Sequence, residues 1–181
     1  MKKTTIFFLL MMPFFFSAQN SELSVGIGAF GSTKFRVYNY DHTSSGFEIN
    51  LNYGYKFSQN KIIGSLILGP KFSVVSSESG TASYVEAAVL YAREFPLNGF
   101  LALEPAAGVG FYSLKDNSRV YSPDDYSDYT EIEEKSGVSV PLRLNIVMDR
   151  SRNFSYGFSG QYAFSKPVSL YYVSTFARFS F

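Results

Sequence analysis

The sequence predicts an all-β protein, an eight-stranded antiparallel up-and-down transmembrane β-barrel. Three observations lead to this prediction. Eight segments alternate between apolar and polar residues with a period of two, as half-buried strands do. Aromatic residues make up 18% of the chain and charged residues only 17%, whereas about a quarter of a soluble domain is charged. The chain also ends inside an alternating segment, on Phe181, which suits a closed barrel because its last strand pairs with its first.

The first four alternating segments lie in the N-terminal half. Leu23–Gly31 sets Leu, Val, Ile and Ala against Ser and Gly. Ser45–Phe57 is the most regular, with aromatic and aliphatic residues against Glu, Asn, Gly and Lys. Lys61–Val75 alternates Ile, Leu and Phe with Ser, Gly and Lys, and Ala82–Phe95 alternates Val, Ala and Tyr with Tyr, Glu and Leu. Each is long enough to cross a bilayer at a tilt, which takes about 9–11 residues.

The last four segments follow the same pattern. Gly99–Leu114 sets Leu, Val and Phe against Glu, Ala and Gly, and Ser136–Asp149 sets Val, Leu and Ile against Ser, Arg and Asn. Asn153–Ser165 alternates Phe and Tyr with Ser, Gly and Gln, and Ser169–Phe181 alternates Tyr, Val and Phe with Ser and Arg. Together the segments predict eight strands.

The connections between the segments alternate in length. Those at 58–60, 96–98 and 150–152 are short, whereas those at 32–44 and 115–135 are long. In an antiparallel barrel with an even strand count, the short turns lie at the end that holds both termini. We therefore expect the termini and the short turns at one end and the long loops at the other.

Residues 1–19 predict a secretory signal peptide. A basic start and the apolar run Ile6–Phe16 precede small residues that suit cleavage after Ala18 or Gln19, and this run is too short for a spanning helix. Residues 20–181 then form one barrel domain.

Composition excludes several classes of function. Without Lys2 and Lys3, 14 basic residues stand against 15 acidic ones, so nothing predicts a nucleic-acid partner. Cysteine is absent, which excludes disulfides and thiol chemistry. No motif predicts a cofactor or a metal site.

The polar faces are mostly Gly, Ser, Ala and Asn, which suit the narrow interior of an eight-stranded barrel better than a solvated surface. The apolar faces are then expected to meet lipid. Aromatic residues near the short turns predict an interfacial girdle: Tyr53, Tyr55, Phe57, Phe95, Phe154, Phe179 and Phe181.

Four residues fit the strands less well. Pro70, Pro105 and Pro141 each remove a donor from the strand ladder, so we expect bulges or gaps there. Alternation points Arg93 at lipid, and its place near a turn predicts that it reaches the headgroups.

The chain resembles the small eight-stranded outer-membrane barrels of the OmpA and OmpX type over residues 23–181, and Phe179 with Phe181 is similar to the C-terminal signal read by the barrel-assembly machinery. The signal ending Ser17-Ala18-Gln19 resembles those of Bacteroidetes secretory proteins, which implies a Bacteroidetes-type outer membrane β-barrel family. The resemblance implies the outer membrane of a Gram-negative bacterium, periplasmic termini, surrounding outer-membrane lipid and contact with the assembly machinery during insertion.

Ionisable residues on the polar faces predict a charged lumen: Glu48, Lys56, Lys71, Glu86, Glu104, Arg143 and Arg178. Isolated charges would be costly there, so we expect the three glutamates to pair with Arg143 and Lys71. The pairs would either plug the barrel or act as a gate for a narrow ion or small-solute channel, which OmpA-like barrels imply by resemblance.

The long loop at 115–135 holds seven acidic and three basic residues with interleaved tyrosines. It predicts either a solvated loop or an exposed contact surface for a partner protein, a glycan or a divalent cation. The candidate surface residues are Tyr121, Asp124, Asp125, Tyr126, Asp128 and Tyr129.

An enzymatic function has little support in the loops. His42, Ser76, Ser77 and Glu78 lie in the first two loops, a placement loosely similar to that in the lipid A palmitoyltransferase, without a matching motif. We expect a non-enzymatic barrel with a structural or surface-interaction role. A narrow channel is the first alternative and a lipid A-modifying acyltransferase or deacylase the second.

Overall fold

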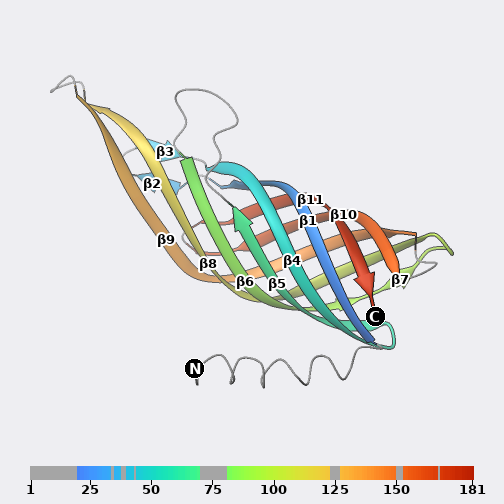
Figure 1. Cartoon of the computed structure of the whole chain (residues 1–181). Helices are drawn as coiled ribbons and strands as arrows, with labels where there is room; N and C mark the ends of the chain where they lie inside the picture. The colour runs from blue at the N-terminus through green and yellow to red at the C-terminus, as the bar shows by residue number, and fades with distance from the viewer. Residues whose placement is uncertain are drawn as a thin grey trace, which may run out of the picture.

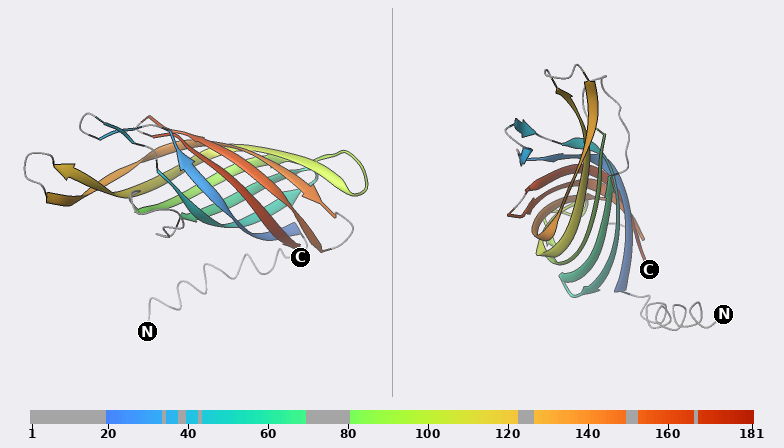
Figure 2. Two further views of the ribbon diagram at one scale, coloured as in Figure 1. Left: turned by 90° about the horizontal axis from the view of Figure 1, so that it is seen from above. Right: turned by 90° about the vertical axis from the view of Figure 1, so that its left-hand side faces the viewer.

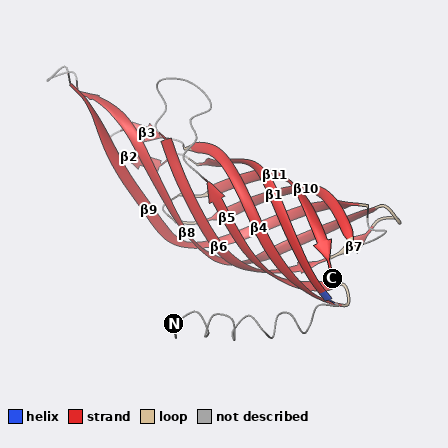
Figure 3. Cartoon of the chain, in the orientation of Figure 1, coloured by secondary structure: helices blue, strands red, loops and turns tan. Residues whose placement is uncertain are grey.

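The computed structural model describes residues 20–33, 35–37, 40–42, 44–69, 81–122, 127–149, 153–166 and 168–181, and side chains within 35–42, 81–82 and 116–133 are outside this description. Nearly all of the described chain is strand (Figure 3). The predicted signal peptide, residues 1–19, lies outside the described residues, so it stays a prediction.

Eight long strands and three short ones make up the described chain (Figure 1). The long strands are β1 (Ser21–Ser32), β4 (Ser45–Phe57), β5 (Asn60–Gly69), β6 (Thr81–Arg93), β8 (Leu101–Ser122), β9 (Ser127–Met148), β10 (Phe154–Phe164) and β11 (Leu170–Ser180). The short strands are β2 (Phe35–Val37), β3 (Tyr40–His42) and β7 (Phe95–Pro96).

The eight long strands close into an antiparallel barrel in which each strand pairs with its neighbours along the chain. The order β6-β5-β4-β1-β11-β10-β9-β8 is closed by pairing of β6 with β8. The two ends of the chain form the seam, from Glu22 opposite Ser180 to Ser32 opposite Leu170. The Phe181 backbone N–H continues this seam by donating to the Ser21 carbonyl at 2.9 Å. The predicted up-and-down barrel of eight strands is confirmed.

The short turns, the start of β1 and the end of β11 lie at one end of the barrel, which we call the turn end (Figure 1). Ser58 and Gln59 join β4 to β5, and Ser58 has a φ of 61°, as two-residue hairpins with primed turns require. In the next turn, the Asn98 side chain accepts hydrogen bonds from the backbone N–H groups of Phe100 and Leu101. The opposite end is the loop end. The predicted turn at 150–152 lies outside the described residues.

Two predicted loops contain regular structure instead. The loop at 32–44 includes β2 and β3, which pair with each other. The loop at 115–135 is largely a hairpin, because β8 and β9 continue to pair as far as Ser122 opposite Ser127. This hairpin extends beyond the other strands at the loop end (Figure 2). Sequence alternation did not reveal it because a hairpin without an apolar face has no apolar–polar period.

Ladder gaps occur at two of the predicted prolines. Pro105 lies opposite Arg93, where the ladder between β6 and β8 breaks before β7 resumes it in the same register. Pro141 lies opposite Gly108, where the ladder between β8 and β9 breaks and resumes in the same register. Both sites are therefore gaps, and no residue is inserted as in a bulge. Pro70 lies outside the described residues.

Apolar side chains cover the outer surface, and polar side chains lie inside. Outward residues in every long strand are exposed, such as Val173 at 66% and Val89 at 57%. The buried residues include many polar ones, among them Asn50, Ser139 and Glu104, the last with 0% exposure. None of the helical segments in the described chain is long and apolar enough to cross a membrane.

The predicted aromatic girdle is found at the turn end. Tyr55, Phe57, Phe95, Phe154, Phe179 and Phe181 are all exposed on the outer surface. Tyr53 is half-buried, and its hydroxyl lies 2.8 Å from the Ser21 hydroxyl. Arg93 is exposed, as predicted, with its guanidinium 5.4 Å from the centre of the Phe95 ring.

Candidate functional site in the barrel interior

The barrel interior holds most of the charged residues predicted for it. Glu48, Glu86 and Glu104 are at most 1% exposed, and Arg143 and Arg178 are 7% and 6% exposed. Lys56 is only half-buried, at the turn end, and Lys71 lies outside the described residues. The interior also contains charged residues that the sequence reasoning missed, and these change the pairing.

Lys61 is the centre of an ion-pair network at the turn end. Its ammonium lies 2.5 Å from Glu104, 2.7 Å from Glu22 and 3.4 Å from Glu94, and the residue is only 1% exposed. At the rim of the barrel, the Lys56 ammonium lies 3.2 Å from the Glu94 carboxylate. We call this group the turn-end network, and its members are Glu22, Lys56, Lys61, Glu94, Glu104 and Arg178. They come from β1, β4, β5, β8 and β11, except Glu94, which follows β6.

Arg178 completes this network through a two-pronged contact with Glu104. Its guanidinium donates to the two carboxylate oxygens at 2.7 and 3.0 Å and lies 3.6 Å from Glu22. The Phe176 ring packs against it, with its centre 5.1 Å from the guanidinium carbon. The network thus contains three acidic and three basic groups, and their charges cancel. A buried ionic cluster needs this balance because each unpaired charge costs several kcal/mol.

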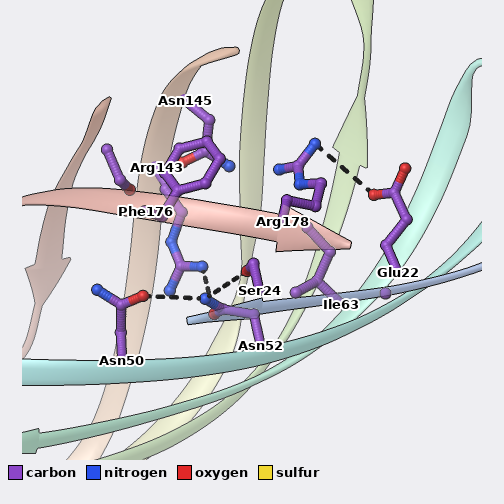
Figure 4. Close-up of a pocket in the computed structure, with 11 residues that line it drawn as sticks. Glu22, Ser24, Asn50, Asn52, Ile63, Arg143, Asn145, Phe176 and Arg178 are labelled. Carbon is purple, nitrogen blue, oxygen red and sulfur yellow. Dashed lines mark hydrogen bonds and ion pairs between the residues drawn. The ribbon is translucent and has the colours of Figure 1, made fainter. Parts of the chain in front are cut away.

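Arg143 lies deeper in the barrel and contacts neutral partners. It donates to Gln161, Asn52 and Ser65, each at 2.7 Å. Figure 4 shows Asn52 also linked to Asn50 and Ser24 beside this arginine. Hydrogen bonds to a charged group contribute about 1.5–3 kcal/mol each, so these three offset part of the cost of burying the guanidinium.

Glu86 and Glu48 also lack a basic partner within 4 Å among the described residues. Glu86 lies 2.7 and 2.8 Å from the hydroxyls of Tyr84 and Tyr172, which also contact each other, and accepts hydrogen bonds from Ser139 and Gln161. Glu48 accepts from Asn50 at 3.2 Å through one oxygen, and its other oxygen has no hydrogen-bond partner.

Arg143 forms no ion pair with Glu48, Glu86 or Glu104, so the predicted pairing with Arg143 is wrong, whereas the predicted pairing with Lys71 lies outside the described residues. Glu104 pairs with Lys61 and Arg178 instead. Contacts across the lumen depend on the height of each residue along the axis, which register and strand tilt determine together. Glu22 and Lys61 could have been found, because each shares the inward alternation of its own strand, two residues before Ser24 and Ile63.

The sequence predicts mostly small side chains in the barrel interior, but the structure also places large apolar and aromatic ones there. A layer of apolar and aromatic side chains crosses the lumen toward the loop end, and we call it the apolar layer. The Tyr84 ring lies 5.6 Å from those of Phe30 and Tyr172 and 6.3 Å from that of Tyr112. The complete layer is Phe30, Ile67, Tyr84, Tyr112, Leu114, Ala163, Val168, Leu170 and Tyr172.

A cavity of about 20 Å³ lies between the turn-end network and Arg143, which is enough for an ordered water but not for an open pore. Its lining includes Glu22, Asn52, Asn145 and Arg178 (Figure 4). Asn145 donates to Glu104 at 2.8 Å, while its carbonyl oxygen lacks a partner. Within the described part of the chain, no three His, Asp or Glu side chains come together as a metal site would require.

The predicted surface residues lie on the β8–β9 hairpin or outside the description. Tyr121 belongs to β8, and Asp128 and Tyr129 belong to β9. Asp124, Asp125 and Tyr126 lie outside the described residues. Of the residues considered for enzymatic chemistry, His42 pairs with Phe35 in the β2–β3 hairpin, and Ser76, Ser77 and Glu78 lie outside the described residues.

Comparison with solved structures supports the architecture. The chain is similar to Neisserial surface protein A, with a TM-score of 0.64 and 10% identity over 89% of this chain and 97% of that one. It is also similar to the attachment invasion locus protein Ail of Yersinia pestis, with a TM-score of 0.55 and 20% identity over 90% and 99%. This chain has the same fold. A further structure of Ail, in complex with the heparin analogue sucrose octasulfate, has a TM-score of 0.54.

No protein-family model and no curated protein matches the sequence. At 10–20% identity, the structural similarity shows the eight-stranded barrel and nothing more specific.

Proposed function

We propose that this protein is an integral β-barrel of the outer membrane of a Gram-negative bacterium and acts at the cell surface without catalysis. The distribution of side chains carries the proposed location. Outward aliphatic and aromatic residues surround the barrel, and each stabilises by about 1.5–3 kcal/mol on leaving water. Summed over the outer surface, burial in lipid contributes on the order of tens of kcal/mol. Soluble monomers rarely expose such a continuous apolar surface.

The turn end is proposed to face the periplasm. The start of β1 and the end of β11 lie there, and outer-membrane barrels place short turns on that side. Phe179 and Phe181 are exposed on the outer surface at the end of β11, where the assembly machinery has access to them as a signal. Membership of the OmpA and OmpX type, or of a Bacteroidetes-type family, is part of this proposal.

The β8–β9 hairpin is the proposed contact surface. In the described chain, β6 begins at Thr81 opposite Asn117, and β10 ends at Phe164 opposite Val140. Among the described residues, 127–139 of β9 therefore have strand partners only in β8. An exposed strand edge offers backbone donors and acceptors to an added strand.

The charge of the hairpin indicates which partner it prefers. Residues 115–135 contain seven acidic and three basic residues, so a basic extended segment of a partner protein fits better than an anion. Ail was solved with an anionic heparin analogue, whereas the acidic hairpin of this chain would repel such a ligand. A glycan partner would then have to be uncharged.

Two experiments test the proposal. Cell fractionation with heat-modifiable gel mobility tests the location, and a soluble protein of normal mobility would refute it. For the contact, a reconstituted barrel is titrated with an extended Lys-Thr peptide and compared with a variant in which an Asn-Gly turn replaces 117–132. We expect binding that weakens with salt and is lost in the shortened variant. Equal binding by both barrels would refute the hairpin as the contact site.

The plugged lumen is a further part of the proposal. It is supported by the cavity of about 20 Å³, which is too small for an open pore, and by the balanced turn-end network, which fills the turn end of the lumen but reaches water at its Lys56 rim. A narrow channel would need these ion pairs to change partners, which conductance in planar bilayers tests. A lipid A-modifying enzyme remains an alternative, and unchanged lipid A products after His42→Ala would remove it.

A further inference from the structure

Polar and apolar side chains divide the barrel interior along its axis. The turn-end network, Arg143 and its amide partners fill the part toward the termini. The apolar layer fills the part toward the loop end, and each of its nine residues is at most 3% exposed. These residues come from six of the eight long strands, β1, β5, β6, β8, β10 and β11, with Val168 from the segment before β11.

Two of the three tyrosine hydroxyls in the layer point away from the loop end, whereas that of Tyr112 accepts a hydrogen bond at 3.2 Å from Ser165, just past the loop end of β10. Tyr84 and Tyr172 place theirs against Glu86, on the polar side. The rest of the layer is apolar: it contains the rings of these tyrosines and the side chains of Leu114 and Leu170, which are 1% and 0% exposed. The layer therefore offers an ion little to replace its hydration shell, and apolar constrictions of this kind exclude ions by excluding water.

The turn end of the polar interior, in contrast, reaches water. The Lys56 side chain is 37% exposed, and its partner Glu94 is 9% exposed. Exposure then falls along the network to 1% at Lys61 and 0% at Glu104. The cavity of about 20 Å³ lies next to this network.

We propose that the apolar layer, and not the ion-pair network, seals the barrel against the cell exterior. The polar interior is then a blind pocket that small ions enter only from the turn end. This inference concerns the lumen and goes beyond the proposed surface function, but it rests on the proposed membrane location. A chain that fails to insert is recognised first by its gel mobility, so the two failures are distinguishable.

A single cysteine below the layer tests the proposal, since the chain has none of its own. Ser174→Cys places a thiol two residues beyond Tyr172, on the polar side. Silver ions are the probe, because they are small and react with thiols. The unreacted thiol is measured with a maleimide after unfolding. In nanodiscs, where both ends meet water, we expect the thiol to react.

In vesicles with the loop end outward, external silver should react with this thiol slowly. Orientation is checked by proteolysis of the hairpin. Adding Leu170→Ala should raise the rate by at least about tenfold, equivalent to 1.4 kcal/mol of barrier, and Tyr84→Ala is a second variant if the first fails to fold. The control Glu104→Gln, in the turn-end network, should leave the loop-side rate unchanged.

Four results would overturn the inference. The first is rapid loop-side reaction with the layer intact. The second is a layer variant that folds but does not accelerate it, and the third is a Glu104→Gln variant that accelerates it as much as the layer variant does. An unreactive thiol in nanodiscs would equally exclude the opening at the turn end.

Discussion

Replacing Lys61 by methionine removes the central cation of the turn-end network and keeps most of the side-chain volume. Three carboxylates lie 2.5–3.4 Å from its ammonium, which is almost fully buried. Removing one partner of a buried ion pair costs about 3–5 kcal/mol, because the other charges stay buried without it. Arg178 still contacts two of the carboxylates, so we expect a loss near 3 kcal/mol. The folded-to-unfolded ratio would then fall by roughly a hundredfold.

The assay is urea unfolding of the barrel in lipid vesicles, with the folded fraction read from heat-modifiable gel mobility. The matched control is Lys115→Met. Lys115 lies 3.6 Å from Glu134, and these side chains are 45% and 58% exposed, so we expect a loss of at most about 1 kcal/mol. The double variant with Glu104→Gln should lose less than the sum of the single variants. A loss for Lys61→Met no larger than that of the control would refute the reasoning.

Further predictions concern the wall of the barrel and its ends. A Cβ at Gly157 would overlap a backbone carbonyl of β9, whereas nothing lies within 4 Å of one at Gly160. We therefore expect Gly157→Ala to lower the unfolding free energy by about 1–3 kcal/mol and Gly160→Ala to leave it nearly unchanged, measured by urea unfolding in vesicles. Leu51→Arg, on the outer face halfway along β4, should cost about 2–4 kcal/mol in a bilayer, and Leu97→Arg in a turn at most about 1; equal costs would argue against a lipid-facing surface. Phe181→Ala keeps the backbone hydrogen bond to Ser21 and removes only a side chain that is 59% exposed. It should reduce the amount inserted in cells without lowering the stability of barrel refolded in detergent, and normal insertion would remove the role of Phe181 as an assembly signal.

The strand pattern and the two faces of the barrel follow from local sequence. β4 has the predicted bounds, Ser45–Phe57, because alternation of apolar and polar residues is a property of the strand alone. The same alternation placed Glu48, Glu86 and Arg143 inside. It also predicted the ladder gaps at Pro105 and Pro141, because proline lacks an N–H wherever it lies.

Pairing inside the lumen could not be predicted in this way. Glu104 on β8 meets Lys61 on β5 and Arg178 on β11, strands far apart in the sequence. Their meeting depends on register and tilt, which bring the three residues to one height. The β8–β9 hairpin was missed for a related reason, because backbone pairing between two polar segments leaves no apolar period in the sequence.

Sequence alone determined the eight-stranded barrel, the apolar outside and the identity of most interior charges, since each depends on alternation within one strand. Tertiary structure decided which interior charges meet, where the apolar layer crosses the lumen and how far the hairpin extends. These features depend on several strands at once, because only closure of the barrel sets the height and the direction of each side chain relative to the others.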